Sequence, residues 1–178
     1  NEERAIVGTI YKQKSKEEAI KIGKEFFKQK RPDFLQEVEK HKDKTIIVNC
    51  WRGGMRSKFI VDMLCSLGYN AIQLQGGYKE YRKYVREQLE KFELKPRLVV
   101  LWGLTCTGKT KLLSHFSNSL DLEGLAQHRG SLYGGIGLKP RSQKTFENLL
   151  LWKLRELNGE KYIFIEGEGR KIGDVQMP

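Results

Sequence analysis

Two glycine-rich loops in this chain each follow a run of β-branched and aliphatic residues and precede a stretch whose apolar residues recur at helical spacing. The first loop spans residues 50–57, Cys-Trp-Arg-Gly-Gly-Met-Arg-Ser, and the second spans residues 103–110, Gly-Leu-Thr-Cys-Thr-Gly-Lys-Thr. A chain that repeats the order strand, loop, helix is predicted to form parallel α/β sheets. Free backbone amides gather at the start of a helix, so both loops are predicted to bind anions.

The rest of the chain fits this alternation of strands and helices. Residues 1–13 are expected to be irregular, and Pro32 is expected to separate two helices. The other predicted helices cover residues 15–28 with Ser15 as cap, 34–38, 57–67 ended by Gly68, 78–89 after a turn at Gly76-Gly77, 109–116 and 143–157. The predicted strands cover residues 45–49, which we expect to be buried, and 70–74, 97–101, 120–122 and 162–165.

The first loop places a cysteine at the carboxyl end of a predicted strand. The free amides that begin the next helix, with Arg52 and Arg56 nearby, are expected to favour the thiolate of Cys50 and so to lower its pKa. Gly53 and Gly54 let the backbone approach an anion closely, because neither carries a Cβ. We therefore predict that Cys50 is a nucleophile assisted by the two arginines. The predicted anion loop further comprises Trp51, Met55 and Ser57.

The spacing of this loop leaves several alternatives open. Five residues separate Cys50 from Arg56, one more than is typical of sulfurtransferases and the same number as in cysteine phosphatases. The wider loop should accept an anion larger than sulfide. A phosphatase would also need a general acid for its leaving group, and the sequence beside the loop offers no obvious one. A simpler alternative makes Cys50 a small buried apolar residue, as we expect Cys65 to be.

The second loop matches the complete phosphate-binding pattern Gly-x-x-x-x-Gly-Lys-Thr. Its amides are expected to surround phosphate oxygens, while Lys109 reaches the terminal phosphates and the Thr110 hydroxyl ligates Mg²⁺. Glu166, or Glu168 just after it, could hold the metal through water, although either could simply end a strand, and Asp121 and Glu123 are equally ambiguous. The other predicted phosphate contacts are Gly103, Thr105, Thr107 and Gly108, with His128 and Arg129 from the run His-Arg-Gly-Ser.

The formal net charge of +11 suits a polyanionic partner such as nucleic acid, although a solvated helix face would explain it equally well. We expect Arg82, Lys83 and Arg86 to contact that partner. The chain has no apolar run of about 18 residues and no N-terminal signal segment, so we expect no membrane span. Its three cysteines cannot all pair with one another, which favours a reducing cytoplasm.

Residues 50–57 resemble the active-site loop of rhodaneses, which carry sulfur or selenium on the cysteine, and Gly76-Gly77-Tyr78 resembles the end of a rhodanese domain. The complete series of motifs resembles the tRNA 2-selenouridine synthase family, in which a rhodanese domain is fused to a P-loop domain. The segments that carry this resemblance are residues 3–13, 50–57, 103–110, 121–131, 146–150 and 166–173.

The resemblance implies a partial rhodanese-like parallel sheet domain over residues 1–92, with its N-terminal part missing. A partial P-loop NTPase-like parallel α/β domain would follow over residues 96–178, with its C-terminal part missing. The implied activity is a transferase reaction that converts 2-thiouridine at the tRNA wobble position to 2-selenouridine. Selenophosphate would donate selenium and geranyl diphosphate would supply a geranylated intermediate.

The resemblance also implies roles for the two loops and their partners. Cys50 would handle selenium, and the P-loop would hold a diphosphate or a nucleotide, with Mg²⁺. The partners would be tRNA and a selenophosphate-producing enzyme. One departure is Cys106, which stands where the family usually has glycine and could alter the approach of phosphate.

Three other functions compete with this one. The chain could be a rhodanese-type sulfurtransferase, or a cysteine phosphatase, fused to a P-loop kinase-like module. It could also be a non-catalytic RNA-binding module, an alternative motivated by charge alone.

Overall fold

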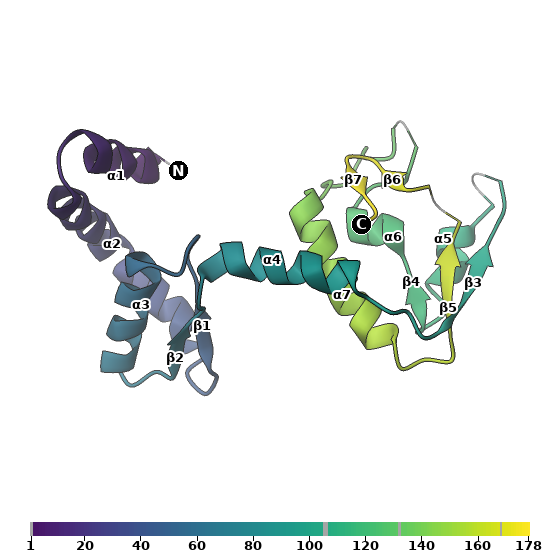
Figure 1. The fold of residues 1–178 in the computed structure, drawn as a ribbon, viewed down its shortest axis with the longest axis horizontal. Coiled ribbons are helices and arrows are strands. Elements are labelled where there is room, and N and C mark those ends of the chain that lie inside the picture. The colour runs from purple at the N-terminus through teal and green to yellow at the C-terminus, as the bar shows by residue number, and fades with distance from the viewer. Residues whose placement is uncertain (1, 105–106, 132, 168) are drawn as a thin grey trace. The chain divides into compact units, whose positions relative to one another are not determined.

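The computed structural model describes residues 2–104, 107–131, 133–167 and 169–178, and its contacts divide the chain into two compact units, Asn1–Gly77 and Tyr78–Pro178. The elements of the first unit are α1 (Glu2–Gln13), α2 (Lys16–Glu39), β1 (Ile46–Val48), α3 (Met55–Ser66) and β2 (Ala71–Gln73) (Figure 1). Those of the second are α4 (Gly77–Glu90, which begins at the last residue of the first unit), β3 (Arg97–Leu101), α5 (Lys109–Leu113), β4 (Ser119–Leu120), α6 (Leu122–Ala126), α7 (Gln143–Leu157), β5 (Tyr162–Glu166), β6 (Lys171–Ile172) and β7 (Val175–Gln176).

The two compact units divide after Gly77, the first residue of α4, whereas the sequence predicts a domain boundary at residues 92–96. The difference arises because side chains of α4 contact α7: the Arg155 guanidinium donates to Tyr84 Oη at 2.7 Å and to Gln88 Oε1 at 2.6 Å. Val85 of α4 is fully buried. Helix α4 therefore belongs by its contacts to the second unit.

The segment expected to be irregular forms helix α1, so that prediction is wrong. Acidic residues occupy its first turn and a lysine its last, as the helix dipole favours. The helix lies along α2, where a Cβ added to Gly23 would lie 3.8 Å from Val7 Cγ2 and Glu3 forms an ion pair with Lys30 at 2.5 Å. Docking on a neighbouring helix, rather than local propensity, accounts for α1.

Helix α2 begins as predicted, because the Ser15 hydroxyl accepts a backbone amide of the first turn at 3.1 Å. The predicted break at Pro32 does not occur, and α2 continues through it. Phe27 packs edge-to-face on Phe34 beyond the proline and on Phe59 of α3, with ring centroids 5.7 and 5.8 Å apart. These aromatic contacts offset the backbone hydrogen bond that proline cannot make.

Strands β1 and β2 pair in parallel, with Ile46 opposite Ala71 and Val48 opposite Gln73. Helix α3 joins them and buries Leu64 against the pair. The predicted order strand, loop, helix, strand is therefore confirmed, and Gly68 ends the helix at a positive φ of 84° as expected. The first strand is not wholly buried, because Ile47 is 60% exposed.

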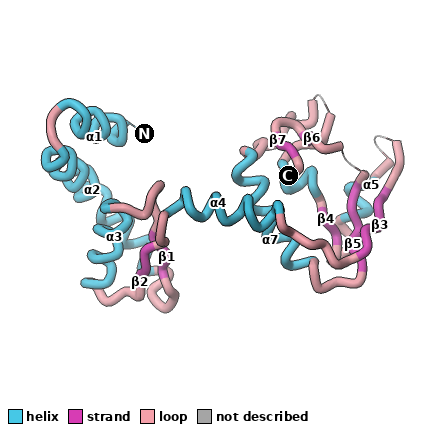
Figure 2. The backbone as a smooth tube through the Cα atoms, viewed as in Figure 1, coloured by secondary structure: helices cyan, strands magenta, loops and turns pink. Residues whose placement is uncertain are grey.

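The second unit contains a three-stranded parallel sheet in the order β3-β5-β4 (Figure 2). Strand β3 pairs with β5 from Arg97 opposite Tyr162 to Leu101 opposite Glu166. The prediction of parallel α/β sheets is therefore confirmed. Helix α5 ends at Leu113, three residues before its predicted end.

Strand β5, helices α6 and α7, and the antiparallel pair β6-β7 surround the main core of this unit, which includes Phe146, Leu150, Ile163, Ile172 and Val175. Helix α6 and the β6-β7 pair were not predicted, because elements of two to five residues are too short to show a hydrophobic period. None of the helices in the described part of the chain could cross a lipid bilayer, since none is long and apolar enough.

Candidate functional site

The Cys50 sulfur lies just beyond the end of β1, at the start of α3. Its Sγ atom is 3.2 Å from the Ser57 hydroxyl and accepts the Gly54 amide at 3.3 Å. Ser57 is in the first turn of α3 and is only 1% exposed. The sulfur therefore faces one buried hydroxyl and the amides of its own loop.

These donors control the ionisation of Cys50. Burial of the sulfur by itself raises the pKa of the thiol, but hydrogen bonds from the Ser57 hydroxyl and from the backbone at Ser57, Gly54 and Arg52 lower that pKa from 9.0 to about 7. Cys50 therefore ionises at lower pH than an ordinary cysteine, and its thiolate fraction falls as pH decreases below the pKa. The expectation that the charges of Arg52 and Arg56 lower this pKa is corrected, since a hydroxyl and backbone amides do so and both arginines are exposed.

Two glycines in direct backbone contact hold the cysteine loop in shape. Gly53 and Gly77 both adopt positive φ, 64° and 62°. A Cβ on Gly77 would lie 2.2 Å from the Cys50 carbonyl oxygen and 2.3 Å from the Gly53 nitrogen. The turn at Gly76-Gly77 therefore closes against the cysteine loop, a contact that the sequence did not predict.

Replacing Gly77 by alanine should disrupt this contact. We expect the variant Gly77→Ala to lose about 2–4 kcal/mol of stability, because the new Cβ meets backbone atoms and φ is unfavourable for alanine. The matched control is Gly68→Ala, where φ is 84° but nothing lies within 4 Å of a Cβ, so only about 1 kcal/mol should be lost. Urea unfolding midpoints followed by circular dichroism compare the two, and equal losses would contradict the proposed close contact.

Gln73 is the residue of this site that sequence reasoning missed. Its side-chain amide donates to the Gly53 carbonyl oxygen at 2.6 Å, to the Gly54 carbonyl oxygen at 3.1 Å and to the Ser57 hydroxyl at 2.9 Å. The available signal was its position: a polar residue at the carboxyl end of the strand next to the cysteine strand faces the same sheet edge as the loop.

The phosphate loop connects β3 to α5. Gly108 has a φ of 84° at the start of the helix, and the Lys109 ammonium donates to the carbonyl oxygens of Gly103 and Leu104 at 2.9 and 3.0 Å. Thr107 also donates to Leu104, at 2.8 Å. Lys109 thus lies over its own loop, where phosphate oxygens could replace these two carbonyl groups. Among the predicted contacts, Thr105 lies outside the described residues, as does Cys106.

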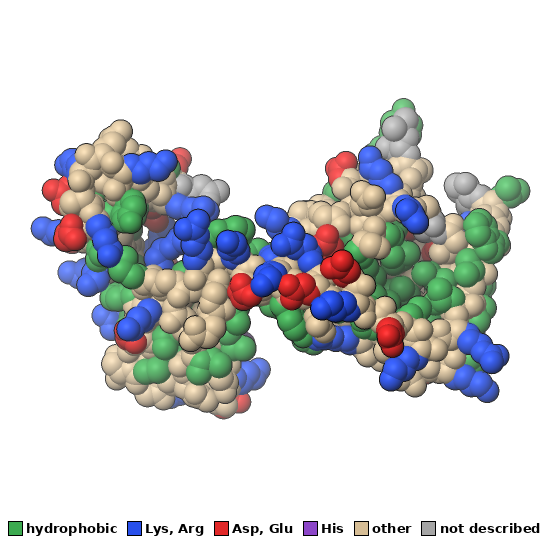
Figure 3. All heavy atoms as spheres, in the orientation of Figure 1, with side chains coloured by type: hydrophobic (Ala, Val, Ile, Leu, Met, Phe, Trp, Pro, Cys, Tyr) green, Lys and Arg blue, Asp and Glu red, His purple; other side chains and the backbone are tan. Residues whose placement is uncertain are grey.

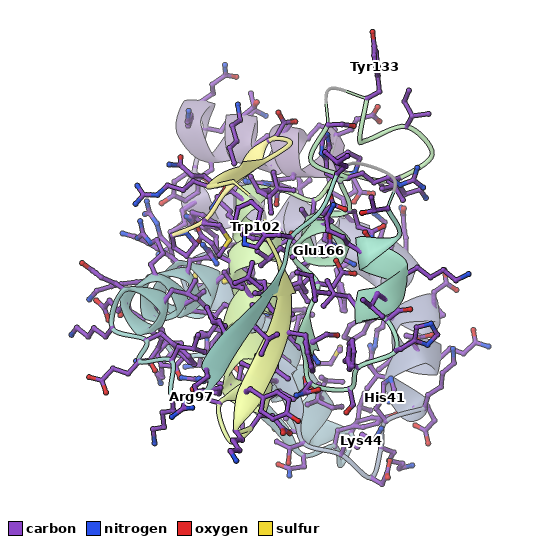
Figure 4. The ribbon with its side chains drawn as sticks, turned by 90° about the vertical axis from the view of Figure 1, so that its right-hand side faces the viewer. His41, Lys44, Arg97, Trp102, Tyr133 and Glu166 are labelled. Carbon is purple, nitrogen blue, oxygen red and sulfur yellow. The ribbon has the colours of Figure 1, made fainter. Side chains whose placement is uncertain are left out.

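Glu166 ends β5 beside the strand that leads into the phosphate loop. It is 6% exposed, and its Oε1 atom is buried without a hydrogen-bond partner among the described residues. Figure 4 shows Glu166 and Trp102 at one end of the β3-β5 pair and Arg97 at the other. A buried carboxylate oxygen rarely lacks a hydrogen-bond partner. Carboxylate oxygens are ligands for Mg²⁺ and Ca²⁺, so this oxygen is chemically suited to bind a hydrated cation. The second candidate, Glu168, lies outside the described residues.

The His128 ring is held between two glycine segments. A Cβ on Gly134 or on Gly173 would come within 2.9 or 2.8 Å of its Nδ1 atom. That nitrogen is buried and has no hydrogen-bond partner in the described part of the chain. The ring helps to line a pocket of about 310 Å³, with Gly130, Ser131, Lys171, Gly173 and Asp174. Arg129 is exposed beside it, and a phosphate contact by either residue stays a prediction.

Arg82 is not available to nucleic acid. It is 8% exposed, forms an ion pair with Glu147 of α7, and donates to Asn148 Oδ1 and to the Lys144 carbonyl oxygen. The prediction that it contacts tRNA is therefore corrected, because its guanidinium joins α4 to α7. Lys83 and Arg86 remain exposed on α4.

Comparison with known proteins gives consistent results for the whole chain. Residues 96–178 match the family model described as the tRNA 2-selenouridine synthase AAA domain. The full chain is 39% identical to the tRNA 2-selenouridine synthase of Nitrosomonas europaea and 37% identical to that of Hydrogenovibrio crunogenus, and it covers 49% and 52% of those proteins. A crystal structure of an N-terminal domain from Clostridium difficile 630 is 45% identical, with a TM-score of 0.46, over 48% of this chain and 67% of that one. The chain spans about half the length of the curated relatives it matches, and it belongs to the tRNA 2-selenouridine synthase family.

Proposed function

We propose that this chain carries the two reactive loops of a tRNA 2-selenouridine synthase. The protein would geranylate 2-thiouridine at the tRNA wobble position and then replace the geranylthio group with selenium. One observation supports this most directly: a cysteine with a pKa of about 7, held by loop amides, occurs in the same chain as a complete phosphate loop. The β1-β2 pair and the Gly77 contact support a partial rhodanese-like domain in residues 1–77, the part of the predicted range 1–92 that forms the first compact unit.

The phosphate loop would serve the first step by holding the diphosphate of geranyl diphosphate. Lys109 would exchange its two carbonyl contacts for phosphate oxygens, which bind an ammonium more strongly because they are charged. The sulfur of 2-thiouridine would then attack the first carbon of the geranyl group, and diphosphate would leave.

The residues of this loop fit a bound Mg²⁺. The described residues contain no group of three or more metal-ligating side chains, but Mg²⁺ commonly uses one or two protein ligands, with phosphate and water completing its shell. The Thr110 hydroxyl and the buried Glu166 carboxylate would hold it. When bound, it would neutralise charge on the departing diphosphate. The same loop would also accept a nucleotide.

The cysteine loop would serve the second step. Selenophosphate is an anion, and the amides of residues 52–57 with the exposed Arg52 and Arg56 suit such a donor. The Cys50 thiolate would attack the phosphorus of selenophosphate, forming a phosphocysteine and releasing selenide. The selenide would displace the geranylthio sulfur as geranylthiolate from the carbon of the base, and water would hydrolyse the phosphocysteine to phosphate and free thiolate. Alkylation makes the geranylthio sulfur a better leaving group than a bare thiocarbonyl, which is the chemical reason for two steps.

The basic surface supports tRNA as the polyanionic partner. The net charge is +11, and Figure 3 shows Lys and Arg side chains interspersed with acidic ones over α1, α2 and α4. Lys83 and Arg86 on α4 remain the proposed contacts, although Lys83 lies 3.7 and 3.8 Å from two glutamates of the same helix. A selenophosphate-producing enzyme is a further proposed partner.

Nucleoside mass spectrometry tests the proposal. The full-length protein is incubated with tRNA that contains 2-thiouridine, with geranyl diphosphate and with selenophosphate. We expect geranylated 2-thiouridine when selenophosphate is omitted and 2-selenouridine when both are present. An unchanged nucleoside with active cosubstrates would contradict the proposal. The alternative of a cysteine phosphatase, favoured by the Cys50 to Arg56 spacing, predicts instead phosphate release from an aryl phosphate.

A further inference from the structure

The Gln73 side chain has three hydrogen-bond acceptors within reach, all in the cysteine loop or at its end. They are the carbonyl oxygens of Gly53 and Gly54 and the hydroxyl oxygen of Ser57. The two carbonyl groups fix the orientation of the amide, because its own oxygen would be repelled by them. The Gln73 nitrogen therefore faces the loop and donates to it.

This arrangement decides where the single proton of the Ser57 hydroxyl goes. Two acceptors compete for it, the Gly54 carbonyl oxygen at 3.1 Å and the Cys50 sulfur at 3.2 Å. Gln73 also donates to the Gly54 carbonyl oxygen and occupies one lone pair of Ser57. Because the Ser57 oxygen accepts from Gln73, its hydrogen points away from Gln73, and the charged sulfur is the stronger of the two acceptors when Cys50 is ionised.

We propose that Gln73 is the positioning residue that directs the Ser57 hydroxyl to the Cys50 sulfur. Gln73 does not touch the sulfur and acts through Ser57, which is almost fully buried between them. Its importance for selenium transfer rests on the proposed function, but its effect on the thiolate does not. Cysteine alkylation, which needs neither tRNA nor selenophosphate, therefore tests it independently of the proposed function.

The test measures how the alkylation rate of Cys50 by iodoacetamide depends on pH in the whole chain. Peptide mass spectrometry separates Cys50 from Cys65 and Cys106. The Gln73→Met variant keeps the length of the side chain but removes its donors. We expect the midpoint of its curve of alkylation rate against pH to rise by about one pH unit from a value near 7. The rate at pH 6 should then fall about tenfold, while the plateau at high pH stays unchanged. The control Gln75→Met changes an exposed residue two positions later and should leave the midpoint unaltered.

A double-mutant cycle tests the route through Ser57. Ser57→Ala alone should also raise the midpoint, and adding Gln73→Met to it should produce little further change. An unchanged midpoint in Gln73→Met would overturn the proposal, and so would a full additional shift in the Ser57→Ala background. A lower plateau with an unchanged midpoint would show that Gln73 only shapes the loop. If Gln73→Met does not fold, Gln73→Glu keeps the shape, lacks the amide donors and should raise the midpoint further by repelling the thiolate.

Discussion

Replacing Cys50 by serine in the full-length protein is expected to stop tRNA modification at the geranylated intermediate. A serine hydroxyl stays protonated at neutral pH, whereas the structure lowers the pKa of Cys50 to about 7, so the substitution removes the nucleophile but keeps the size of the side chain. We expect 2-selenouridine formation to fall roughly a thousandfold or more. Nucleoside mass spectrometry should show geranylated 2-thiouridine accumulating instead.

The matched control is Cys65→Ser. Cys65 is exposed on α3, so the expectation that it is buried is wrong, and its thiol donates to the Ala71 carbonyl oxygen at 3.4 Å. Serine can make the same hydrogen bond, so activity should be retained. If Cys50→Ser formed 2-selenouridine at a rate within about tenfold of the unaltered protein, Cys50 could not be the residue that handles selenium.

Replacing Lys109 by alanine should stop the reaction one step earlier. The ammonium group of Lys109 is the charged side chain of the phosphate loop, and its removal leaves the diphosphate held by backbone amides and any bound cation. We expect geranylation to slow roughly a hundredfold or more, with unmodified 2-thiouridine remaining in the tRNA. Isothermal titration with inorganic diphosphate should show weaker binding.

The control for this variant is Lys111→Ala, two residues further along the short helix α5, which removes the same charge from an exposed position. It should leave diphosphate binding close to that of the unaltered protein. The two active-site variants differ in the nucleoside that accumulates, 2-thiouridine for Lys109→Ala and geranylated 2-thiouridine for Cys50→Ser. Accumulation of the same nucleoside in both would contradict a division of labour between the two loops.

Local sequence predicted the elements that carry both loops. The strands that end before Cys50 and before Gly103, and the helices that follow, were found because β-branched runs, glycines and apolar spacing act within one segment of chain. The Ser15 cap and the positive φ of Gly68 were found for the same reason, since each depends on a few neighbouring residues.

The errors have a common origin in contacts between distant segments. Helix α1 forms by docking on α2, α2 passes through Pro32 because phenylalanines pack on both sides of it, and Arg82 is buried by an ion pair with Glu147. The contacts of Glu3 with Lys30 and of Arg82 with Glu147 leave no local pattern, because the partners lie 27 and 65 residues apart in the sequence, whereas Phe27 and Phe34 stand at helical spacing across the proline. Local propensity therefore gave wrong predictions for α1 and for the helix around Pro32, and charge alone gave a wrong prediction for Arg82.

By itself, the sequence determined that the chain presents two glycine-rich loops, each between a strand and a helix, because strand, loop and helix order and glycine placement are local properties. Only the tertiary structure decided how the cysteine loop works. It brings Gly77 into backbone contact with the loop, adds the Ser57 hydroxyl to the expected amides as donors to Cys50 in place of the expected arginine charges, and places Gln73 behind that serine. Hydrogen bonds and close backbone contacts depend on ångström-scale distances between residues brought together by folding, and such distances are not encoded in any single stretch of sequence.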